Sequence, residues 1–563
     1  MSSMKRILKL TTLSLLLLGA LSSCHKVEVS INSELTPDVY PQTAAQFSSA
    51  TGPVYVALRG NWSVDYYFLQ TLSSDEAILP AFGGNWYDGD KYEQLHKHTW
   101  TKDNAWVNSV WTYLENVIGT TNQTLYILKG ATDGAAKQTT LAELKTVRAL
   151  CYFLLMDLYA NVPIDSVYGN TTLHTNTPRA QVFTYVESEL KAALPYLNRV
   201  SGQGQYGRPN AYTAYAILAK MYLNAEVYTQ TSRYDDCIAA CDSVINSGLY
   251  SLEPMSSYLQ MFYPTNGPTQ KEFIFAIPYD ASTTNGYMFH ARYDLNRNLG
   301  IKYKYSGSTA GTITDPIMNQ TYSGSGLINS QPSGPQSVLP EYYAYYTDPN
   351  DVRNGQWLGG LQYWPDGQPL MVKTTNKGYD ASYSGSAPAD TYTYQLNLTP
   401  GMQFRSTATG ANPSLFDFGN DEIAWNMGYR NIKFYPDYTN TVSRNQNNDV
   451  PVFRYSDIIL MKAEAILRGG TATSGQSALS LSNQLRAART TTAAWTTVTL
   501  DSVYAERARE FSWECWRRND MVRFGKFEDA YGFKTDADIN HRIFPIPTTA
   551  LSTNATLTQN TGY

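Results

Sequence analysis

Apolar residues recur at helical spacing between residues 210 and 248, and this pattern predicts two antiparallel helices. The apolar face of the first helix consists of Ala214, Leu218, Met221, Tyr222 and Ala225. The apolar face of the second helix consists of Ile238, Cys241 and Ile245. Asn210 and Ser232 are suited to cap these helices, and Gly248 is suited to end the second. Because such a hairpin cannot bury its apolar face alone, it requires neighbouring helices.

Further amphipathic stretches supply these neighbours. Helices are predicted over residues 51–73, 103–128, 144–158, 178–193, 453–468, 478–488 and 501–524. The sequence thus predicts a mostly α fold, in which four tetratricopeptide-like helix pairs form a scaffold and start near residues 104, 141, 211 and 453. In the last stretch, 501–524, Arg and Glu are mixed with Trp, which predicts internal ion pairs packed against other helices.

Two regions have the composition of loops. Residues 74–103 contain three glycines, and residues 251–450 are rich in Tyr and Gly but poor in amphipathic stretches. Long loops on a rigid scaffold commonly form binding surfaces. We therefore expect a helical scaffold over 51–250 with a ligand loop at 74–103, a loop-rich ligand-binding lobe over 251–450, and a C-terminal scaffold and tail over 451–563.

The N-terminal segment has the pattern of a secretory signal. Basic residues precede an apolar run from Leu10 to Ala20, and small residues then lead to Cys24, as in the lipobox of bacterial lipoproteins. The run is too short to span a membrane. We expect residues 1–23 to be a signal peptide, Cys24 to carry the lipid, and residues 24–50 to form a tether, so that the chain is anchored to a membrane through lipid only. The alternative is an ordinary signal peptide with an incidental Cys.

Composition narrows the function classes further. Charged residues make up 16% of the chain, against about 25% in typical domains. The net charge of −5 gives no reason to expect nucleic acid as a partner, and the 44 Tyr residues suit an uncharged ligand. The catalytic signatures H-E-x-x-H, G-x-S-x-G and the P-loop are absent. Glu93, His96 and His98 form a metal-like cluster, for which a hydrogen-bonded loop is the favoured interpretation. We expect no metal and no cofactor.

Five blocks of the sequence resemble the SusD/RagB family, the surface nutrient-binding lipoproteins of Bacteroidetes. They are RALCYFLLMDLYANVPI (148–164), YGRPNAYTAYAILAKMYL (206–223), FRYSDIILMKAEAI (453–466), ERAREFSWECWRRNDMVRFGKF (506–527) and IFPIPTTALSTNATLTQNTGY (543–563). The last two blocks are highly specific, and the resemblance extends from Cys24 to Tyr563. The chain departs from the family at Cys515, where Gly is frequent, and at Thr561, where Pro is common.

The resemblance implies the same architecture, four helix pairs with a loop-rich ligand-binding lobe, and it adds partners. It implies a SusC-like TonB-dependent transporter, which the lipoprotein covers as a lid at the cell surface of the outer membrane. It also implies oligosaccharides from polysaccharides as ligands, occasionally peptides, and no enzymatic activity. A glycoside hydrolase and a tetratricopeptide adaptor for a protein partner are the alternatives from other classes.

Sugars bind by stacking their C–H faces on aromatic rings while their hydroxyl groups meet short polar side chains. Aromatic residues within Gly-rich loops are therefore the candidate contacts. They are Trp86, Tyr87 and Asp88 in GGNWYDGD, Tyr287 in TTNGYMF, and Trp357, Tyr363 and Trp364 in NGQWLGGLQYWPDG. The alternative for each ring is packing against the helices beneath it.

Overall fold

The computed structural model describes residues 40–283, 288, 290–295, 299, 313–314, 321–322, 334–364, 366–374, 392–404, 411–437 and 445–563. Over these residues helices predominate and the strands are short, which confirms the mostly α fold class. The predicted signal peptide, Cys24 and most of the predicted tether lie outside the described residues. Within the described ranges, no helix is both long and apolar enough to cross a membrane.

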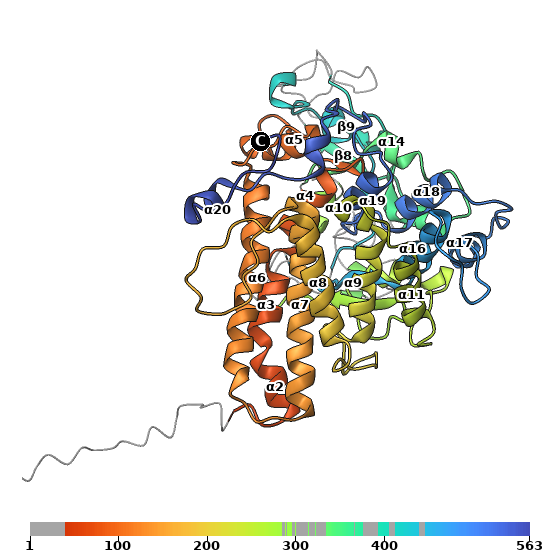
Figure 1. Ribbon diagram of the computed structural model, residues 1–563. Coiled ribbons are helices and arrows are strands. Elements are labelled where there is room, and N and C mark those ends of the chain that lie inside the picture. The colour runs from red at the N-terminus through yellow and green to blue at the C-terminus, as the bar shows by residue number, and fades with distance from the viewer. Residues whose placement is uncertain are drawn as a thin grey trace, which may run out of the picture.

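Long helices and shorter ones that adjoin them stand side by side in one part of the molecule (Figure 1). In chain order they are α2 (Ala44–Ala50), α3 (Gly52–Gly60), α4 (Tyr67–Leu72), α6 (Ala105–Lys129), α7 (Ala135–Tyr159) and α8 (Arg179–Ala193). Helix α6 packs against α3 and α7, and α7 packs against α8. A π-helical turn, η1 (Trp62–Tyr66), separates α3 from α4, so the helix predicted over 51–73 is interrupted.

The hairpin predicted in the middle of the chain is confirmed. It consists of α9 (Ala211–Leu223), the short α10 (Ala225–Thr229) and α11 (Tyr234–Ile245), and α9 packs against α11. Asn210 caps α9, because its side-chain oxygen accepts hydrogen bonds from the N–H groups of Tyr212 and Thr213 at 3.0 and 2.9 Å. The predicted cap at Ser232 is wrong: Arg233 precedes α11 and makes no side-chain cap.

The C-terminal pair is also confirmed. It consists of α16 (Tyr455–Leu467) and α17 (Ala478–Ala487), which pack against each other. Helix α16 also packs against α11. The last pair therefore continues the row begun by the N-terminal helices, although about 200 residues separate the two in sequence.

The single helix predicted over 501–524 is wrong, because the structure divides it. The two helices are α18 (Leu500–Glu510) and α19 (Arg517–Arg523). Between them Trp513 and Cys515 have φ of 58° and 66°. A left-handed backbone cannot continue a right-handed helix, so the chain turns at these two positions. The same conformation favours glycine, which explains why the SusD/RagB pattern often has Gly where this chain has Cys515.

Two expected loop or tether regions contain helices. Helix α2 lies inside the predicted tether, where Thr43 and Gln46 form a reciprocal capping box that starts it. Helix α5 (Lys91–Lys97) lies inside the predicted loop over 74–103, preceded by the 3₁₀ turn η2 (Asp88–Asp90). These helices were missed because they are only about two turns long, too short for a clear period in the apolar pattern.

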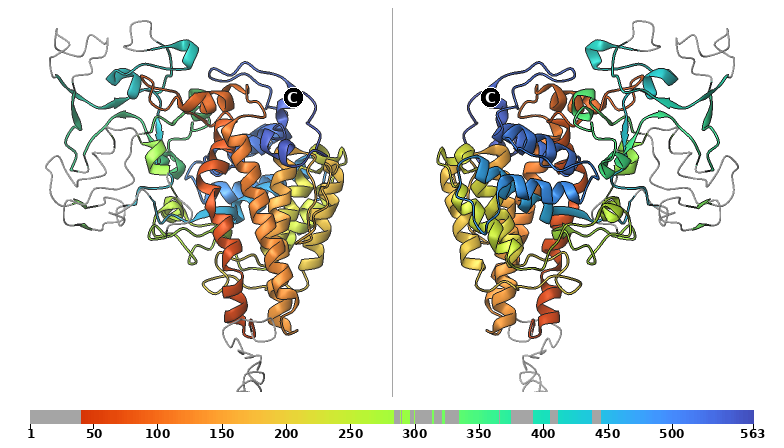
Figure 2. Two further views of the ribbon diagram at one scale, coloured as in Figure 1. Left: turned by 90° about the vertical axis from the view of Figure 1, so that its left-hand side faces the viewer. Right: turned by 90° about the vertical axis from the view of Figure 1, so that its right-hand side faces the viewer.

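The segment between the third and fourth helix pairs contains mostly short elements. They are η3 (Met255–Ser257), η4 (Leu259–Phe262), β2 (Phe273–Ile277), α12 (His290–Asp294), β3 (Ile313–Thr314), β4 (Thr321–Tyr322), β5 (Ser337–Val338), α14 (Pro340–Tyr343), η5 (Val352–Gln356), β6 (Trp357–Leu358), β7 (Gly360–Leu361), β8 (Met371–Thr374), β9 (Tyr392–Gln395), β10 (Asn397–Leu398), η6 (Pro413–Leu415), α15 (Glu422–Trp425), β11 (Arg430–Asn431) and β12 (Val450–Arg454). Figure 2 shows much of this region to one side of the long helices.

Strands tie this segment to the rest of the fold. The first long strand, β2, pairs antiparallel with β12, which runs directly into α16. Strand β1 (Ala77–Ile78) follows α4 and pairs with β5, while β11 pairs with β6 and contacts β5. These four strands therefore lie in the order β1, β5, β11, β6. The chain ends with η7 (Ile539–Arg542) and α20 (Thr548–Thr553).

A buried ion network joins the loop-rich segment to the C-terminal helices. We define it as Arg353, Arg454, Arg489, Glu272, Glu506, Glu510 and Glu514, all of them buried. Arg454 lies 2.5 Å from Glu272 and 2.7 Å from both Glu510 and Glu514. Burial alone raises the pKa of the Glu510 carboxyl, but the three guanidinium groups outweigh it and hold that pKa well below its usual range. The internal ion pairs predicted from residues 501–524 are thus confirmed.

Candidate functional site

The loop over residues 81–90 is anchored at its base by a carboxylate. The Asp417 side chain accepts hydrogen bonds from the N–H groups of Gly83 and Gly84 at 2.7 and 2.6 Å. Gly83 also requires glycine, because its φ is 60° and an added Cβ would lie 2.4 Å from the Cβ of Asn420. The loop is therefore held in one position against a segment that is distant in sequence.

Trp86 stands on this loop in a strained conformation. Its φ is 66°, which is rare for a bulky side chain. Its half-buried ring meets the Tyr293 ring edge-on, with 5.5 Å between centroids, and the Arg292 guanidinium lies 5.3 Å from the ring centroid. Both contacts come from α12 of the loop-rich segment. Because strain of this kind tends to persist at functional positions, it supports Trp86 as a candidate.

The two other candidates on the loop are Tyr87 and Asp88. Tyr87 is half-buried and Asp88 is exposed. The Asp88 carboxylate accepts a hydrogen bond from the Tyr92 hydroxyl at 3.3 Å and lies 3.4 Å from the Lys91 ammonium. Asp88 also has a positive φ, of 46°. Its carboxylate is thus positioned by neighbours but retains oxygen atoms facing solvent.

Trp357 belongs to a separate aromatic cluster, which we call the Trp357 cluster. Its members are Tyr343, Tyr346, Trp357, Tyr429 and Trp513. The Trp357 ring meets Tyr343 and Tyr346 edge-on, with centroids 5.9 and 5.2 Å away, and tilts against Trp513 at 5.2 Å. Its indole N–H is buried and has no hydrogen-bond partner among the described residues. The ring is half-buried, so packing against other rings accounts for most of its surface.

Tyr363 and Trp364 lie in a hairpin a few residues beyond Trp357. The turn is closed by a 2.9 Å hydrogen bond from the N–H of Gly367 to the carbonyl of Trp364, with φ of 83° at Gly367. Tyr363 is 44% exposed, whereas Trp364 is half-buried against a small apolar cluster of the loop-rich segment. The remaining candidate, Tyr287, lies outside the described residues.

The strand order relates the two aromatic groups. The 81–90 loop follows β1, and Trp357 begins β6, three strand positions away. The pairs β1–β5 and β6–β11 lie next to each other, joined by a 3.1 Å hydrogen bond from the N–H of Val338 to the carbonyl of Tyr429, and β1 and β6 are the two outer strands. The structure therefore places the candidate aromatics at two stations along one strip of strands rather than in a single pocket.

Several residues around the candidates carry no clear sequence signal. Arg292 and Tyr293 contact Trp86 from a segment more than 200 residues away, and nothing in their local sequence indicates that contact. Tyr343 and Tyr346 belong to the Tyr-rich run EYYAYYT, whose density of rings beside Trp357 offered a usable signal. Sequence reasoning missed this group because it looked for aromatic residues within Gly-rich loops, and this run contains no glycine.

The carboxylates that precede the 81–90 loop are structural. Asp75 pairs with Arg517 through two hydrogen bonds of 2.6 and 2.7 Å. Glu76 is buried and accepts a hydrogen bond from the N–H of Trp513 at 2.8 Å. Burial raises the pKa of Glu76 to about 8. Both side chains therefore lock the loop region onto the turn between α18 and α19.

The metal-like cluster is divided among different partners. Glu93 pairs with Lys97 at 2.6 Å, and the buried His96 ring stacks on Phe416. His98 lies 3.2 Å from the carbonyl oxygen of Ser73. Over the described residues, no group of three or more Asp, Glu, His or Cys side chains is arranged to hold a metal ion.

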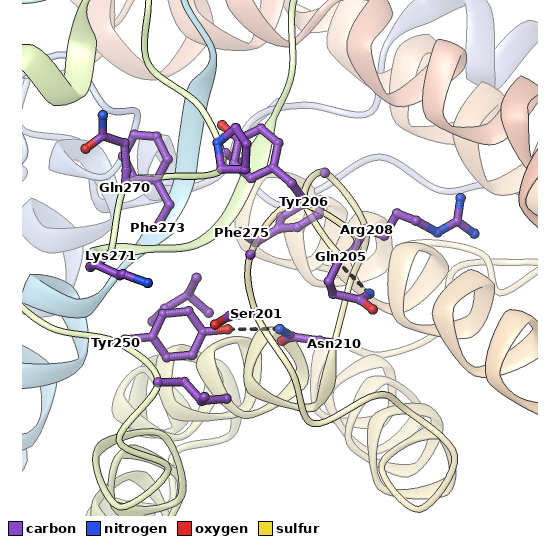
Figure 3. A pocket seen from close by; sticks show the side chains of 16 residues that line it. Ser201, Gln205, Tyr206, Arg208, Asn210, Tyr250, Gln270, Lys271, Phe273 and Phe275 are labelled. Atoms are coloured by element: carbon purple, nitrogen blue, oxygen red, sulfur yellow. Dashed lines mark hydrogen bonds between the residues drawn. The ribbon is translucent and has the colours of Figure 1, made fainter.

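Cavities lie away from the candidate aromatics. The one in Figure 3, bordered by Tyr206, Phe273 and Phe275, has a volume of about 30 Å³, and Tyr250 accepts a 2.9 Å hydrogen bond from Asn210 at its edge. That volume holds about one water molecule, so it is no ligand site. Larger cavities of about 650 and 570 Å³ are lined by other residues. None of these three cavities is lined by a candidate aromatic residue.

Comparisons with known proteins agree with this architecture. Among solved structures, "Surface glycan-binding protein A from Bacteroides uniformis" aligns with a TM-score of 0.65 and 19% identity, covering 92% of this chain and 99% of that one. A structure described as "Laminarin binding SusD-like protein" aligns with a TM-score of 0.63 and 20% identity, over 92% and 99% of the two chains. At these identities the likeness shows the fold.

Curated relatives match over most of their length. The starch-binding protein SusD of Bacteroides thetaiotaomicron is 25% identical over 519 residues, which are 87% of this chain and 84% of that protein. A SusD-like protein of Formosa agariphila is 24% identical over 485 residues, 81% of this chain and 80% of that one.

Two family models match different parts of the sequence. The model described as "Starch-binding associating with outer membrane" matches residues 45–223. The model of the SusD family matches residues 271–563, which is more than half of the chain. The chain therefore belongs to the SusD family.

Proposed function

We propose that this SusD-family protein captures oligosaccharides at the cell surface and passes them to a TonB-dependent transporter in the outer membrane. As a member of the family it is a non-catalytic glycan-binding protein associated with the outer membrane. Relatives whose names specify a ligand bind starch or laminarin. Both are polymers of uncharged sugars, which suits the low charge of this chain.

The observation that carries the proposal is that the Trp86 ring is held in a fixed position at the surface. A strained backbone, a loop base fixed by Asp417 and side support from Tyr293 hold the ring at the surface before any ligand arrives. A preorganised ring loses little conformational entropy when a sugar stacks on it. Asp88, two residues away, supplies carboxylate oxygens for sugar hydroxyl groups.

The second station supports a ligand longer than one sugar. Trp357 begins strand β6, and the exposed Tyr363 lies in the hairpin that follows it, so both belong to a second group of rings apart from the 81–90 loop. An extended oligosaccharide spans such a separation, whereas a single sugar does not. The proposal is therefore an oligosaccharide that touches both stations.

Binding and catalysis are tested together by titrating the protein with maltohexaose and laminarihexaose and assaying new reducing ends. We expect binding without new reducing ends, and about tenfold weaker binding for Trp86→Ala and for Tyr363→Ala. Tyr126→Ala is the matched control, because Tyr126 is 62% exposed on α6 and belongs to neither station. Equal loss in the control, or retention of full affinity in both site variants, would contradict the proposed surface. Binding of peptides but of no glycan would point to a peptide ligand instead.

The transporter is tested by co-purification. We expect a TonB-dependent outer-membrane protein to be recovered with the tagged chain from gentle detergent extracts of the native cells. A control extract from cells expressing an unrelated tagged lipoprotein gives the background. Recovery of the chain alone would argue against the transporter as a stable partner.

A further inference from the structure

A cavity of about 570 Å³ lies between helices α17 and α18 and two loops, over residues 347–350 and 490–499. Its volume falls within the roughly 300–1,000 Å³ typical of small-molecule sites. None of the candidate aromatic residues of the 81–90 loop or of the Trp357 cluster lines it. It is therefore a separate feature of the C-terminal half.

An indole ring forms a fixed wall of this cavity. The backbone of Trp495 is held by the Asn483 side chain, which accepts from its N–H at 2.8 Å and donates to its carbonyl at 2.9 Å. The Arg486 guanidinium lies 4.3 Å from the centroid of the Trp495 ring. Since one ring contact and two hydrogen bonds fix the residue, its position is set without a ligand.

Polar groups border the cavity on the other sides. On α18, Ser502, Ala505 and Arg509 are three and four residues apart, so they share one helix face, and the small Ala505 leaves space there. On the facing loop, Asp348 accepts hydrogen bonds from the N–H of Asn350 at 3.0 Å and from the Thr492 hydroxyl at 2.8 Å. Hydroxyl, amide, carboxylate and guanidinium groups thus surround one aromatic ring.

Charges around the cavity are balanced. Glu506, which lies behind the wall, is 2.5 Å from Arg509 and 3.7 Å from Arg486. With Asp348 opposite, two carboxylates face two guanidinium groups. The lining itself carries two guanidinium groups and one carboxylate, and Glu506 behind it offsets part of the remaining positive charge, so a neutral ligand meets no strong field of one sign.

One donor at the cavity lacks a partner. Arg486 is 6% exposed and lines the cavity, and its Nε–H is buried without a hydrogen-bond partner among the described residues. Burying such a donor without an acceptor is unfavourable, so an acceptor that a ligand brings into the cavity is favoured beside it. The unpaired donor and the Trp495 ring thus lie side by side at one end of the cavity lining.

We propose that this cavity is a second sugar-binding site, in which a neutral glycan unit lies against Trp495 and accepts a hydrogen bond from Arg486. The proposal rests on the proposed glycan-binding function and adds a site to it. The Tyr345–Tyr346 turn separates the two regions: Arg509 donates to the carbonyl of Tyr345 at 3.0 Å, and the Tyr346 ring packs on Trp357. A second site extends the length of polymer that one molecule holds, which raises avidity for long chains.

The test is ¹⁹F NMR of the protein labelled with 5-fluorotryptophan at its 11 Trp positions. The Trp495 resonance is assigned by its disappearance in Trp495→Phe, and the Trp86 resonance likewise in Trp86→Phe. Maltohexaose and laminarihexaose are added as neutral probes and trigalacturonic acid as the anionic control. We expect a neutral probe to shift the Trp495 resonance, in wild type and also in a Trp86→Ala, Trp357→Ala variant. The anionic control is expected to leave it unmoved.

The outcomes separate the two proposals. Movement of the Trp86 resonance without movement of Trp495 overturns the second site and leaves the proposed surface intact. Movement of Trp495 alone supports the second site and overturns the 81–90 loop as a contact. If no probe moves either resonance, both are overturned, and a stronger shift with trigalacturonic acid overturns the neutral ligand class. In Trp495→Ala, the affinity of the second site for the neutral probe is expected to fall about tenfold while the thermal midpoint stays within a few degrees.

Discussion

At the scale of single residues, Trp86 combines two opposing demands. A left-handed backbone costs a non-glycine residue roughly 1–2 kcal/mol. The ring itself gains contacts with Tyr293 and Arg292 from α12. Glycine adopts a positive φ without this steric cost, and the same loop has glycine at two other such positions, Gly83 and Gly84. Stability alone would therefore favour glycine at position 86 as well.

This opposition gives a paired prediction. Trp86→Gly and Trp86→Ala both remove the ring, but only glycine adopts φ of 66° without steric cost. We expect Trp86→Gly to have a free energy of unfolding about 1 kcal/mol higher than Trp86→Ala, while both variants lose glycan affinity equally. Urea titration and calorimetric titration with the best-binding oligosaccharide measure the two quantities. Equal stability of the two variants would show that the backbone strain is absent in solution.

Glu76 gives a pH prediction. Burial raises its pKa from the usual 4.5 to about 8, so its contribution to stability is fully present below pH 4.5 and is lost as the pH rises to about 8. In that window the free energy of unfolding should fall by up to about 1.4 kcal/mol per pH unit from this group. Glu76→Gln, which keeps an acceptor for the N–H of Trp513, should flatten the fall. Urea titrations at several pH values check it, and an unchanged slope in the variant would assign the pH dependence to other groups.

At the scale of elements, the buried ion network attaches the loop-rich segment to α18. Removing Arg454 leaves Glu272, Glu510 and Glu514 buried with one guanidinium fewer to balance them. We expect Arg454→Met to lower the free energy of unfolding by about 3–5 kcal/mol. The measurement is the urea midpoint at constant slope.

Arg542→Met is the matched control for Arg454→Met. Arg542 pairs with Glu528 at 2.6 Å, but its side chain is 31% exposed, so the pair is screened by water. We expect a loss of less than about 1 kcal/mol. A loss of similar size in both variants would mean that burial does not increase the contribution of an ion pair to the free energy of unfolding.

Element boundaries show how far local sequence carries a prediction. The start of α9 follows from Asn210 alone, because its side-chain oxygen accepts hydrogen bonds from the N–H groups two and three residues further along, those of Tyr212 and Thr213. The break between α18 and α19 does not follow from local sequence. Trp513 donates its N–H to Glu76, which lies on another part of the chain, and this distant bond favours a turn where helix propensity favours continuation. Boundaries set by nearby atoms were predictable, and those set by distant partners were not.

At the scale of the whole molecule, the fold class was more accessible than the site. Apolar periodicity located every long helix, because each one must bury a stripe against its neighbours. Loop composition singled out Trp86 and Tyr363, since aromatic residues among glycines are unusual in a core. The support that Tyr293 and Arg292 give to Trp86 joins segments far apart in sequence, so no local pattern predicts it. The same holds for the cavity beside Trp495, which four separate segments enclose.

The proposed lipid anchor is tested on the whole chain. Cys24→Ser removes the thiol to which the lipid is expected to be joined. We expect wild-type protein in its native host to incorporate radioactive palmitate and to sediment with outer membranes, and the variant to do neither. Cys151→Ser is the control, because Cys151 is buried in α7 and has no such role. Label retained by the Cys24 variant would contradict the lipid anchor.

The enclosed position of Arg353, Arg454 and Arg489 has a further consequence outside the cell. Dissolved counter-ions weaken exposed charge pairs within about one Debye length but hardly reach pairs sealed from solvent. The stabilisation that the buried ion network gives to the attachment of the loop-rich segment should therefore change little with salt concentration. If the protein is exposed at the cell surface as proposed, its aromatic stations would keep their spacing through dilution and concentration of the surrounding fluid alike.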